Sequence, residues 1–216
     1  MQSTCVLIGC LSLAMSLAVV AAEAPLQDIK LPKPRMEGGK PLLTALKARQ
    51  SQRAFKAQPL PPQLLSDLLW AAAGINRADS GKRTAPSARN WQEVDVYVVL
   101  PEGAYLYDAR ANMLKAVVKG DLRAATGMQP FAATAPLNLV YVADPSRMEG
   151  APPEDKLLYY AADTGFISQN VYLFCASEGL ATVVRGAVDR KALATALKLP
   201  DTLKVVLAQS VGYPAE

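Results

Sequence analysis

The sequence has 216 residues, with 23 Lys and Arg against 19 Asp and Glu and no histidine, for a formal net charge of +4. This length suits one domain with a sizeable core, and the mild, scattered charge gives no indication of nucleic-acid binding. Without histidine the chain cannot form a Ser-His-Asp or Cys-His catalytic group or a three-histidine zinc site, so an enzyme of this sequence would depend on a bound cofactor.

Residues 1–22 predict a secretory signal peptide, because they are almost continuously apolar and end in small residues. An uncleaved membrane anchor is the alternative, since the apolar run is about as long as the shortest spanning helices. Cleavage after Ala22 would place the protein in the periplasm or the medium, without stable membrane association. It would also remove Cys5 and Cys10, so that Cys175 would have no internal disulfide partner.

Residues 23–40 contain three prolines and the pair Gly38-Gly39, which break regular structure. We expect an extended and mobile lead-in that is not part of the core. One folded domain is expected over residues 41–216.

Two amphipathic helices are predicted at the start of this domain. Pro41 to Gln50 and Pro61 to Ala73 carry leucines at helical spacing, and the second opens with prolines, which the first turn of a helix tolerates. Asn76 to Asn90 then reads as a long polar loop. Loops of that length in compact domains are usually functional or disordered.

Strands and a short helix are expected in the rest of the chain. Val94 to Leu100 and Ala104 to Tyr107 flank Pro101-Glu102-Gly103, which is typical of a β-hairpin. Further strands are expected at Leu137 to Ala143, Thr182 to Val184 and Lys204 to Val211, with a helix at Arg190 to Leu197.

A long central, buried helix is predicted from Glu154 to Gly179, because this stretch lacks proline and ends at a glycine. Ala161, Gly165 and Ser168 share one stripe of this helix with Tyr172, so another backbone could approach closely there. Core packing within the monomer and a contact between two subunits would both explain the stripe.

The first candidate site lies at the end of the first helix, where Arg49 and Arg53 flank Ser51. Two guanidinium groups with a hydroxyl between them suit a phosphate, which arginine can bind bidentately. A solvated helix end would contain the same residues.

Two further candidate sites follow in the chain. Residues 86–92 present the hydroxyl of Ser87 and the carboxamide of Asn90 from a loop that leads into a strand. A capped turn would use the same residue types. Arg185 and Gly186 leave a later strand at a glycine, where backbone N–H groups could approach a flat ligand or the chain could simply turn tightly.

In this order and at these separations, the motifs resemble the nitroreductase-like FMN flavoprotein superfamily, in particular its branch of azoline (thiazole or oxazole) peptide dehydrogenases. The resemblance runs from about Leu42 to Pro214. It rests on Arg49-x-Ser51-x-Arg53, on Arg83-Thr84-Ala85-Pro86-Ser87-Ala88 with Asn90 and Gln92, on Asp163-x-Gly165-x-x-x-Gln169-Asn170 with Gly179-Leu180, and on Gly212-Tyr213-Pro214.

The resemblance implies an α+β sandwich in which helices flank a central antiparallel or mixed sheet. It also implies a homodimer with the long helix at the interface, one FMN at each end of that interface, and a small-molecule substrate. The cofactor-binding residues that it implies are Arg49 and Ser51 for the phosphate and ribityl chain, Arg53 near the N1 and C2 carbonyl edge, Pro86, Ser87 and Asn90 around the pyrimidine edge, and the backbone of Arg185 and Gly186 at N5 and the C4 carbonyl.

The sequence departs from this family in two places. Many relatives carry basic residues after the Gly-Tyr-Pro segment, whereas Ala215 and Glu216 follow it here. We therefore expect phosphate binding to rely on Arg49 or on loop residues such as Lys82 or Arg83, or to be weak. Relatives also often have Pro-Trp where this chain has Glu93-Val94.

The sequence thus predicts an FMN-dependent oxidoreductase that transfers hydride through flavin N5 from a donor, with NAD(P)H as the candidate, to an unidentified acceptor. An exported binding module of this fold without turnover and an enzyme that consumes reduced flavin are the alternatives. No metal site is expected. Because no side chain titrates near neutrality at its reference pKa, flavin reduction is expected to vary little between about pH 6 and about pH 8.

Overall fold

The computed structural model describes residues 24–215, so the predicted signal peptide and its cleavage site lie outside the described residues. A seven-stranded antiparallel sheet forms the centre, in the order β1-β6-β5-β4-β7-β9-β8. Its strands are β1 (Ile29–Lys30), β4 (Val94–Leu100), β5 (Gly103–Asp108), β6 (Met113–Lys119), β7 (Leu137–Ala143), β8 (Ala181–Arg185) and β9 (Lys204–Gly212).

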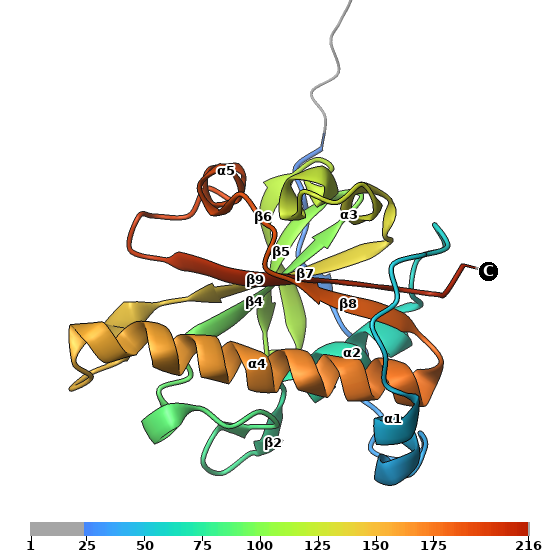
Figure 1. Ribbon diagram of the computed structural model, residues 1–216, viewed down its shortest axis with the longest axis horizontal. Helices are drawn as coiled ribbons and strands as arrows, with labels where there is room; N and C mark the ends of the chain where they lie inside the picture. Colours follow the sequence, from blue (N-terminus) through green and yellow to red (C-terminus); the bar gives the residue numbers. More distant parts are fainter. Residues whose placement is uncertain (1–23, 216) are drawn as a thin grey trace, which may run out of the picture.

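Helices cover both faces of this sheet (Figure 1). The long α4 and α2 pack on one face, whereas α5 and a 3-10 turn pack on the other. The helices are α1 (Leu42–Ala48), α2 (Pro62–Ala73), α3 (Phe131–Thr134), α4 (Pro153–Glu178) and α5 (Arg190–Ala196), and the 3-10 turns are η1 (Ala88–Asn90), η2 (Arg123–Thr126) and η3 (Pro145–Arg147). The predicted α+β sandwich is confirmed, and its central sheet is antiparallel throughout.

The continuous apolar runs of the central strands follow from this two-sided cover. In β4, Val96 and Val98 face the core beneath α2 and α4, whereas Tyr97 and Val99 face the core beneath α5. Because successive side chains of a strand point to opposite faces, a strand buried on both sides is apolar at most positions. The hairpin of β4 and β5 and the strand β7 lie where the sequence predicts them.

The lead-in belongs to the core, which corrects the expectation of a mobile segment. Ile29 and Lys30 form the edge strand β1, which pairs with β6, and Leu31 is buried in the same core as α2. Further along, Arg35 binds Asp67 of α2 at 2.7 Å. The prolines exclude helix here, but extended backbone at a sheet edge accommodates them.

Two other expectations are corrected. The polar segment after α2 contains a small two-stranded sheet of β2 (Ile75–Arg77) and β3 (Lys82–Arg83), so it is not an irregular loop throughout. The helix α4 is buried on one side only, because Leu157, Leu158 and Phe166 are exposed. Within residues 24–215, no helix is long and apolar enough to cross a membrane.

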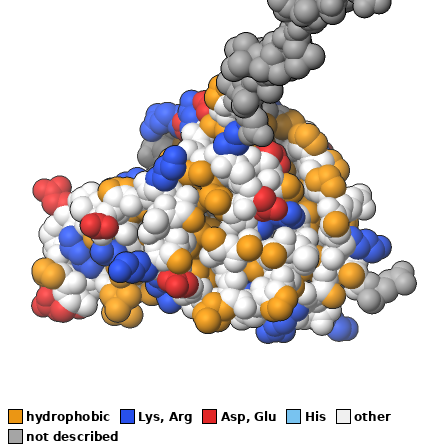
Figure 2. All heavy atoms as spheres, turned by 90° about the horizontal axis from the view of Figure 1, so that it is seen from above, with side chains coloured by type: hydrophobic (Ala, Val, Ile, Leu, Met, Phe, Trp, Pro, Cys, Tyr) orange, Lys and Arg blue, Asp and Glu red, His pale blue; other side chains and the backbone are white. Residues whose placement is uncertain are grey.

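Figure 2 views the molecule from the side of α5 and α3. On this face Lys and Arg side chains are interspersed with Asp and Glu side chains and apolar groups. The described residues therefore form no continuous basic surface on the face drawn.

Candidate functional site

The segment after α1 runs beside β8 and the end of the chain. The N–H of Gln52 donates to the carbonyl of Thr182 at 3.0 Å, and that of Lys56 donates to Tyr213 at 2.9 Å. An isolated bridge also joins Phe55 to Pro214. Three motifs that are far apart in the sequence, around Arg49, around Arg185 and at Gly212-Tyr213-Pro214, are therefore adjacent in the structure.

Tyr172 of α4 contacts both the segment after α1 and β8. Its phenolic oxygen is 2.8 Å from Ser51 Oγ and accepts a hydrogen bond from the N–H of Val184 at 3.0 Å. β8 is an edge strand, so this N–H points away from β9 and needs a partner outside the sheet. The guanidinium of Arg49 lies 5.4 Å from the centre of the same ring, as in a cation–π contact.

Two cations at this cluster are available to an anion. Among the ion pairs formed by residues 24–215, none involves Arg49 or Arg53. Arg49 is half-buried at the end of α1, and Arg53 is exposed. An arginine without a carboxylate partner keeps all its N–H donors for a ligand, and a planar guanidinium suits a phosphate in particular.

The side chain of Arg185 does not point to this cluster. It is buried on the other side of β8, where Nη1 donates to the Thr126 carbonyl at 2.7 Å and Nη2 to Asn138 Oδ1 at 2.9 Å. Burial lowers its pKa to about 10. Only the backbone of Arg185 and of the exposed Gly186 can therefore face a ligand at this end of β8.

Gly127 makes room for that guanidinium. A Cβ atom built on Gly127 would overlap Arg185 Nη1, so any side chain at this position would displace the buried arginine. The glycine backbone is extended, and close approach alone requires it here.

The loop with Pro86, Ser87 and Asn90 forms a second cluster. Ser87 Oγ accepts the N–H of Gln92 at 2.8 Å, and Asn90 Oδ1 accepts from Gln92 Nε2 at 3.1 Å. Pro86 and Asn90 are exposed. The loop has an unusual backbone, because Arg89, Asn90 and Gln92 have φ values of 50°, 58° and 50°. Contacts from outside the loop must hold such a conformation in place.

One of those contacts comes from α4. Asp163 Oδ2 accepts the N–H of Ala88 at 2.9 Å. Asp163 and Tyr172 lie nine residues apart on α4, which corresponds to about 14 Å along the helix. Within one chain the structure therefore brings Arg49, Ser51 and the end of β8 together, but it holds the Ser87 loop at a different point of the helix.

The sequence gives weaker signals for three other residues of these clusters. Tyr172 appears there only as one member of a packing stripe, although a tyrosine hydroxyl inside an apolar helix needs a partner. Asp163 is quoted only as part of a motif. Glu93 is fully buried, and burial together with the nearby Asp163 raises its pKa to about 7. A carboxylate between Trp91 and an apolar strand is the signal that could have singled it out.

Within this chain Arg83 lies at the second cluster, and its role in phosphate binding stays a prediction. Arg83 Nε donates to Gln92 Oε1 at 2.8 Å and Nη1 to the Ala73 carbonyl at 3.0 Å, so the side chain braces the second cluster. Burial is also the main cause that lowers its pKa.

Comparison with known proteins decides the family. The model of the Nitroreductase family matches residues 46–213. The chain belongs to the nitroreductase family. Its members are oxidoreductases that generally use a flavin.

Individual nitroreductase-family relatives agree with this assignment. The chain is 31% identical to a curated relative from Methanocaldococcus jannaschii over 163 residues, which cover 71% of this chain and 82% of that protein. It is 44% identical to a nitroreductase-family crystal structure from Ralstonia eutropha, with a TM-score of 0.85 over 91% of this chain and 93% of that chain. A chain of the Escherichia coli microcin synthetase McbBCD complex has the same fold, with a TM-score of 0.68 at 16% identity over 86% of this chain and 78% of that chain.

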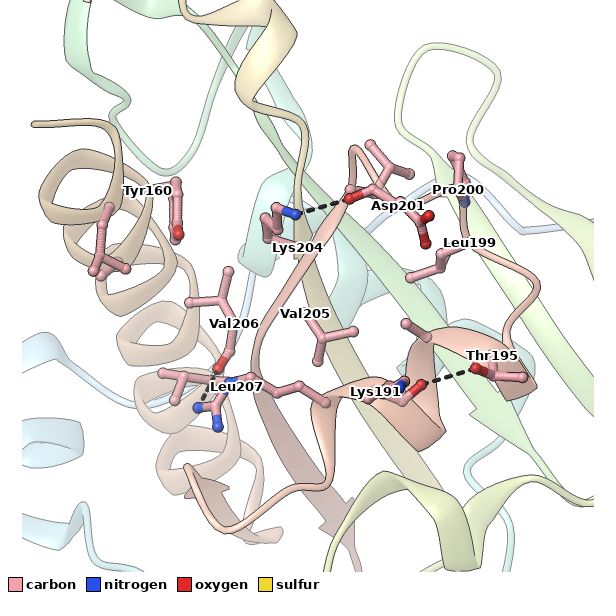
Figure 3. A pocket seen from close by; sticks show the side chains of 15 residues that line it. Tyr160, Lys191, Thr195, Leu199, Pro200, Asp201, Lys204, Val205, Val206 and Leu207 are labelled. Carbon is pink, nitrogen blue, oxygen red and sulfur yellow. Dashed lines mark hydrogen bonds between the residues drawn. The ribbon is translucent and has the colours of Figure 1, made fainter. Parts of the chain in front are cut away.

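A cavity of this nitroreductase-family chain lies apart from both clusters. It has a volume of about 590 Å³ between α4, α5 and β9, with an apolar floor that includes Val205 and Leu207 (Figure 3). Arg190 lines it and donates to the Val206 carbonyl at 3.1 Å. None of the sequence-predicted site residues lines this cavity.

Proposed function

We propose that the protein is an FMN-dependent oxidoreductase of the nitroreductase family. The observation that carries this proposal is the position of Tyr172, whose hydroxyl joins Ser51 to the backbone of Val184. It supports one continuous site that runs from the unpaired Arg49 to the exposed backbone of Gly186, with the unpaired Arg53 on the same segment as Ser51. Such a site fits a long ligand with a phosphate at one end and a hydrogen-bonding ring edge at the other.

Each residue of this cluster has a proposed task. Arg49 and Ser51 would bind the phosphate and the ribityl chain, and Arg53 would lie near the N1 and C2 carbonyl edge, where a positive charge favours the anionic reduced ring. The backbone of Arg185 and Gly186 would donate to N5 and the C4 carbonyl. When bound, FMN supplies hydride transfer through N5 between a donor, with NADH and NADPH as candidates, and a small-molecule acceptor.

A homodimer would complete the site. Both α4 and α1 expose apolar side chains. They are Leu157, Leu158 and Phe166 on α4, and Leu42, Leu43 and Leu46 on α1. A monomer rarely leaves such surfaces in water. If two copies pack α4 against α4, the Pro86, Ser87 and Asn90 loop of one copy can reach the Arg49 cluster of the other across the distance that separates them in one chain.

The branch within the family is also a proposal. The motif from Arg83 to Ala88 and the shared fold of a microcin synthetase chain support a likeness to azoline-forming peptide dehydrogenases. Oxidation of a synthetic azoline to the corresponding azole, followed by its absorbance, would test this acceptor class.

Titration of the purified protein with FMN tests the central proposal. We expect saturable binding and a yellow holoprotein that NADH or NADPH bleaches without oxygen and air recolours. A protein that ignores FMN would favour the binding module without turnover. One that only takes up and consumes flavin reduced elsewhere would favour the reduced-flavin-consuming enzyme.

Export is a separate proposal, supported by the composition of residues 1–22. Mass spectrometry of the protein from the extracytoplasmic fraction of its host should find Glu23 as the first residue. An intact Met1 in the membrane fraction would favour an anchor instead.

A further inference from the structure

Glu93 is a buried carboxyl group for which the surrounding residues supply no hydrogen-bond donor. Its side chain is 0% exposed, and neither Oε1 nor Oε2 has a partner among the described residues. It lines a small internal cavity together with Arg83, Ser87 and Asp163. A charged carboxylate in such a place is costly unless it is paired, so the group needs either a cation or a proton.

Among residues 24–215, no cation forms an ion pair or a hydrogen bond with Glu93. Arg83, from β3, is directed at Gln92 and a backbone carbonyl. Arg147, from η3, binds both oxygens of Asp95 at 2.9 and 2.7 Å and also binds Asp144. The remaining group, from α4, is the carboxyl of Asp163, which has the same sign of charge as an ionised Glu93.

Asp163 must keep a carboxylate oxygen free to accept a hydrogen bond. It is 4% exposed, and its Oδ2 accepts the N–H of Ala88 in the loop that carries Ser87 and Asn90. A proton placed on Glu93 leaves Asp163 free to accept, and the new O–H of Glu93 can itself donate to Asp163. Two carboxylates without a proton would repel each other in a buried site.

We propose that Glu93 and Asp163 share one proton, and that protonated Glu93 is a positioning residue which holds the loop of residues 86–92 in place through Asp163. The loop depends on this anchor because three of its residues, Arg89, Asn90 and Gln92, adopt the left-handed backbone region. Loss of the shared proton would weaken the anchor and release the loop.

The pKa of Glu93 makes this anchor sensitive to pH near neutrality. Burial, with a further contribution from Asp163, raises it from 4.5 to about 7. Between these two values the folded protein keeps a proton that the unfolded chain releases, so stability falls as pH rises through this window. The expectation that flavin reduction varies little with pH stays a prediction, and the raised pKa of Glu93 concerns the stability of the loop.

Thermal unfolding between pH 5 and pH 8 tests the pair without any flavin. The wild-type melting temperature should fall as pH rises, whereas Glu93→Gln, whose amide can still donate to Asp163, should change little. Glu102→Gln, at the exposed turn between β4 and β5, is the matched control and should follow the wild type. Identical pH profiles of the wild type and Glu93→Gln would overturn the shared proton.

Two direct measurements distinguish a proton shared by Glu93 and Asp163 from a general effect of the substitution on stability. The carboxyl ¹³C resonance that is lost in Glu93→Gln should titrate near pH 7 in the wild type, and Asp163→Asn should lower its midpoint. Amide exchange at Ala88, corrected for its intrinsic pH dependence, should accelerate above pH 7 in the wild type but not in Glu93→Gln. A midpoint below pH 5, or equal protection of Ala88 in both proteins, would contradict the proposal.

The effect on the cofactor rests on the proposed function. If the loop contacts FMN, the affinity of the wild type should fall above pH 7 by at most about tenfold per pH unit relative to that of Glu93→Gln. Both proteins bind the same ligand, so ionisation of FMN itself cancels in this ratio. A protein that binds no FMN refutes the proposed function, while the melting, resonance and exchange experiments still decide whether the proton is shared.

Discussion

The hydroxyl of Tyr172 lies 2.8 Å from that of Ser51, although the two residues are 121 positions apart in the sequence. This contact fixes the segment after α1 against the central helix. Because the same tyrosine oxygen accepts the N–H of Val184, it also sets the distance between the segment and the end of β8. The Arg49 cluster is thus attached to rigid elements on both sides, as a binding site requires.

Tyr172→Phe should weaken both the fold and FMN binding. The ring remains beneath Arg49, but Val184 loses its acceptor, which should lower the free energy of unfolding by about 1–2 kcal/mol. Urea denaturation and FMN titration measure the two effects. Tyr160→Phe, on the same helix, is the control and should leave both unchanged. Loss of stability without any change in FMN affinity would separate Tyr172 from the binding site.

Arg49→Ala should weaken FMN binding by about one to two powers of ten, because a charge-assisted hydrogen bond contributes roughly 1.5–3 kcal/mol. Arg190→Ala removes an arginine from the cavity of Figure 3 and should leave the affinity unchanged. Isothermal titration of both variants with FMN decides whether the flavin binds at the Arg49 cluster or in that cavity. The reverse result would place the flavin in the cavity between α4, α5 and β9.

Gly165→Leu should disrupt a dimer without disturbing the fold of one chain. A Cβ atom at Gly165 meets no atom within 4 Å, so the chain itself has room for a side chain there. Between two packed helices the same leucine would cost about 1–3 kcal/mol or more through overpacking. Light scattering should show a wild-type dimer and a folded variant that dissociates. A wild-type monomer would remove the subunit contact.

Gly127→Ala should destabilise the protein by about 1–3 kcal/mol, because its methyl group would overlap the buried guanidinium of Arg185. Gly186→Ala, measured without flavin, is the matched control, since its added Cβ atom meets only Leu207 Cδ2 at 3.8 Å. Thermal unfolding measures both variants. Equal melting temperatures would show that Arg185 can move without cost.

Much of the fold follows from local sequence patterns. The predicted strand at residues 137–143 agrees with β7, and the predicted helix from Glu154 to Gly179 agrees with α4 to within one residue at each end. The absence of proline between residues 154 and 179 and a glycine with φ of 72° at the end of α4 explain the success for the helix. β6 was not predicted, because most of its side chains are only half-buried and it has little alternation. Its pairing with β1 joins positions about 85 apart, which no local pattern reveals.

The arrangement of the candidate site depends less on local sequence patterns than the fold does. The Arg-x-Ser-x-Arg spacing indicates an anion site, and the structure leaves Arg49 and Arg53 unpaired, as such a site requires. The sequence does not show that Arg185 turns to the far side of β8, because this depends on Thr126 and Asn138 from other elements. The protonation state of Glu93 likewise depends on Asp163, which lies 70 positions further along the chain and is brought near by the fold.

The most direct test of a flavin site shared between two chains is a subunit-mixing measurement. Arg49→Ala and Asn90→Ala homodimers should each bind FMN poorly, because every site carries one defect. After unfolding and refolding an equal mixture, each mixed dimer has one intact site if Arg49 and Asn90 of different chains meet, and the mixture should regain about a quarter of the wild-type FMN capacity. If both residues serve the same site within one chain, every site in the mixture stays defective. No gain in FMN capacity would then contradict the account.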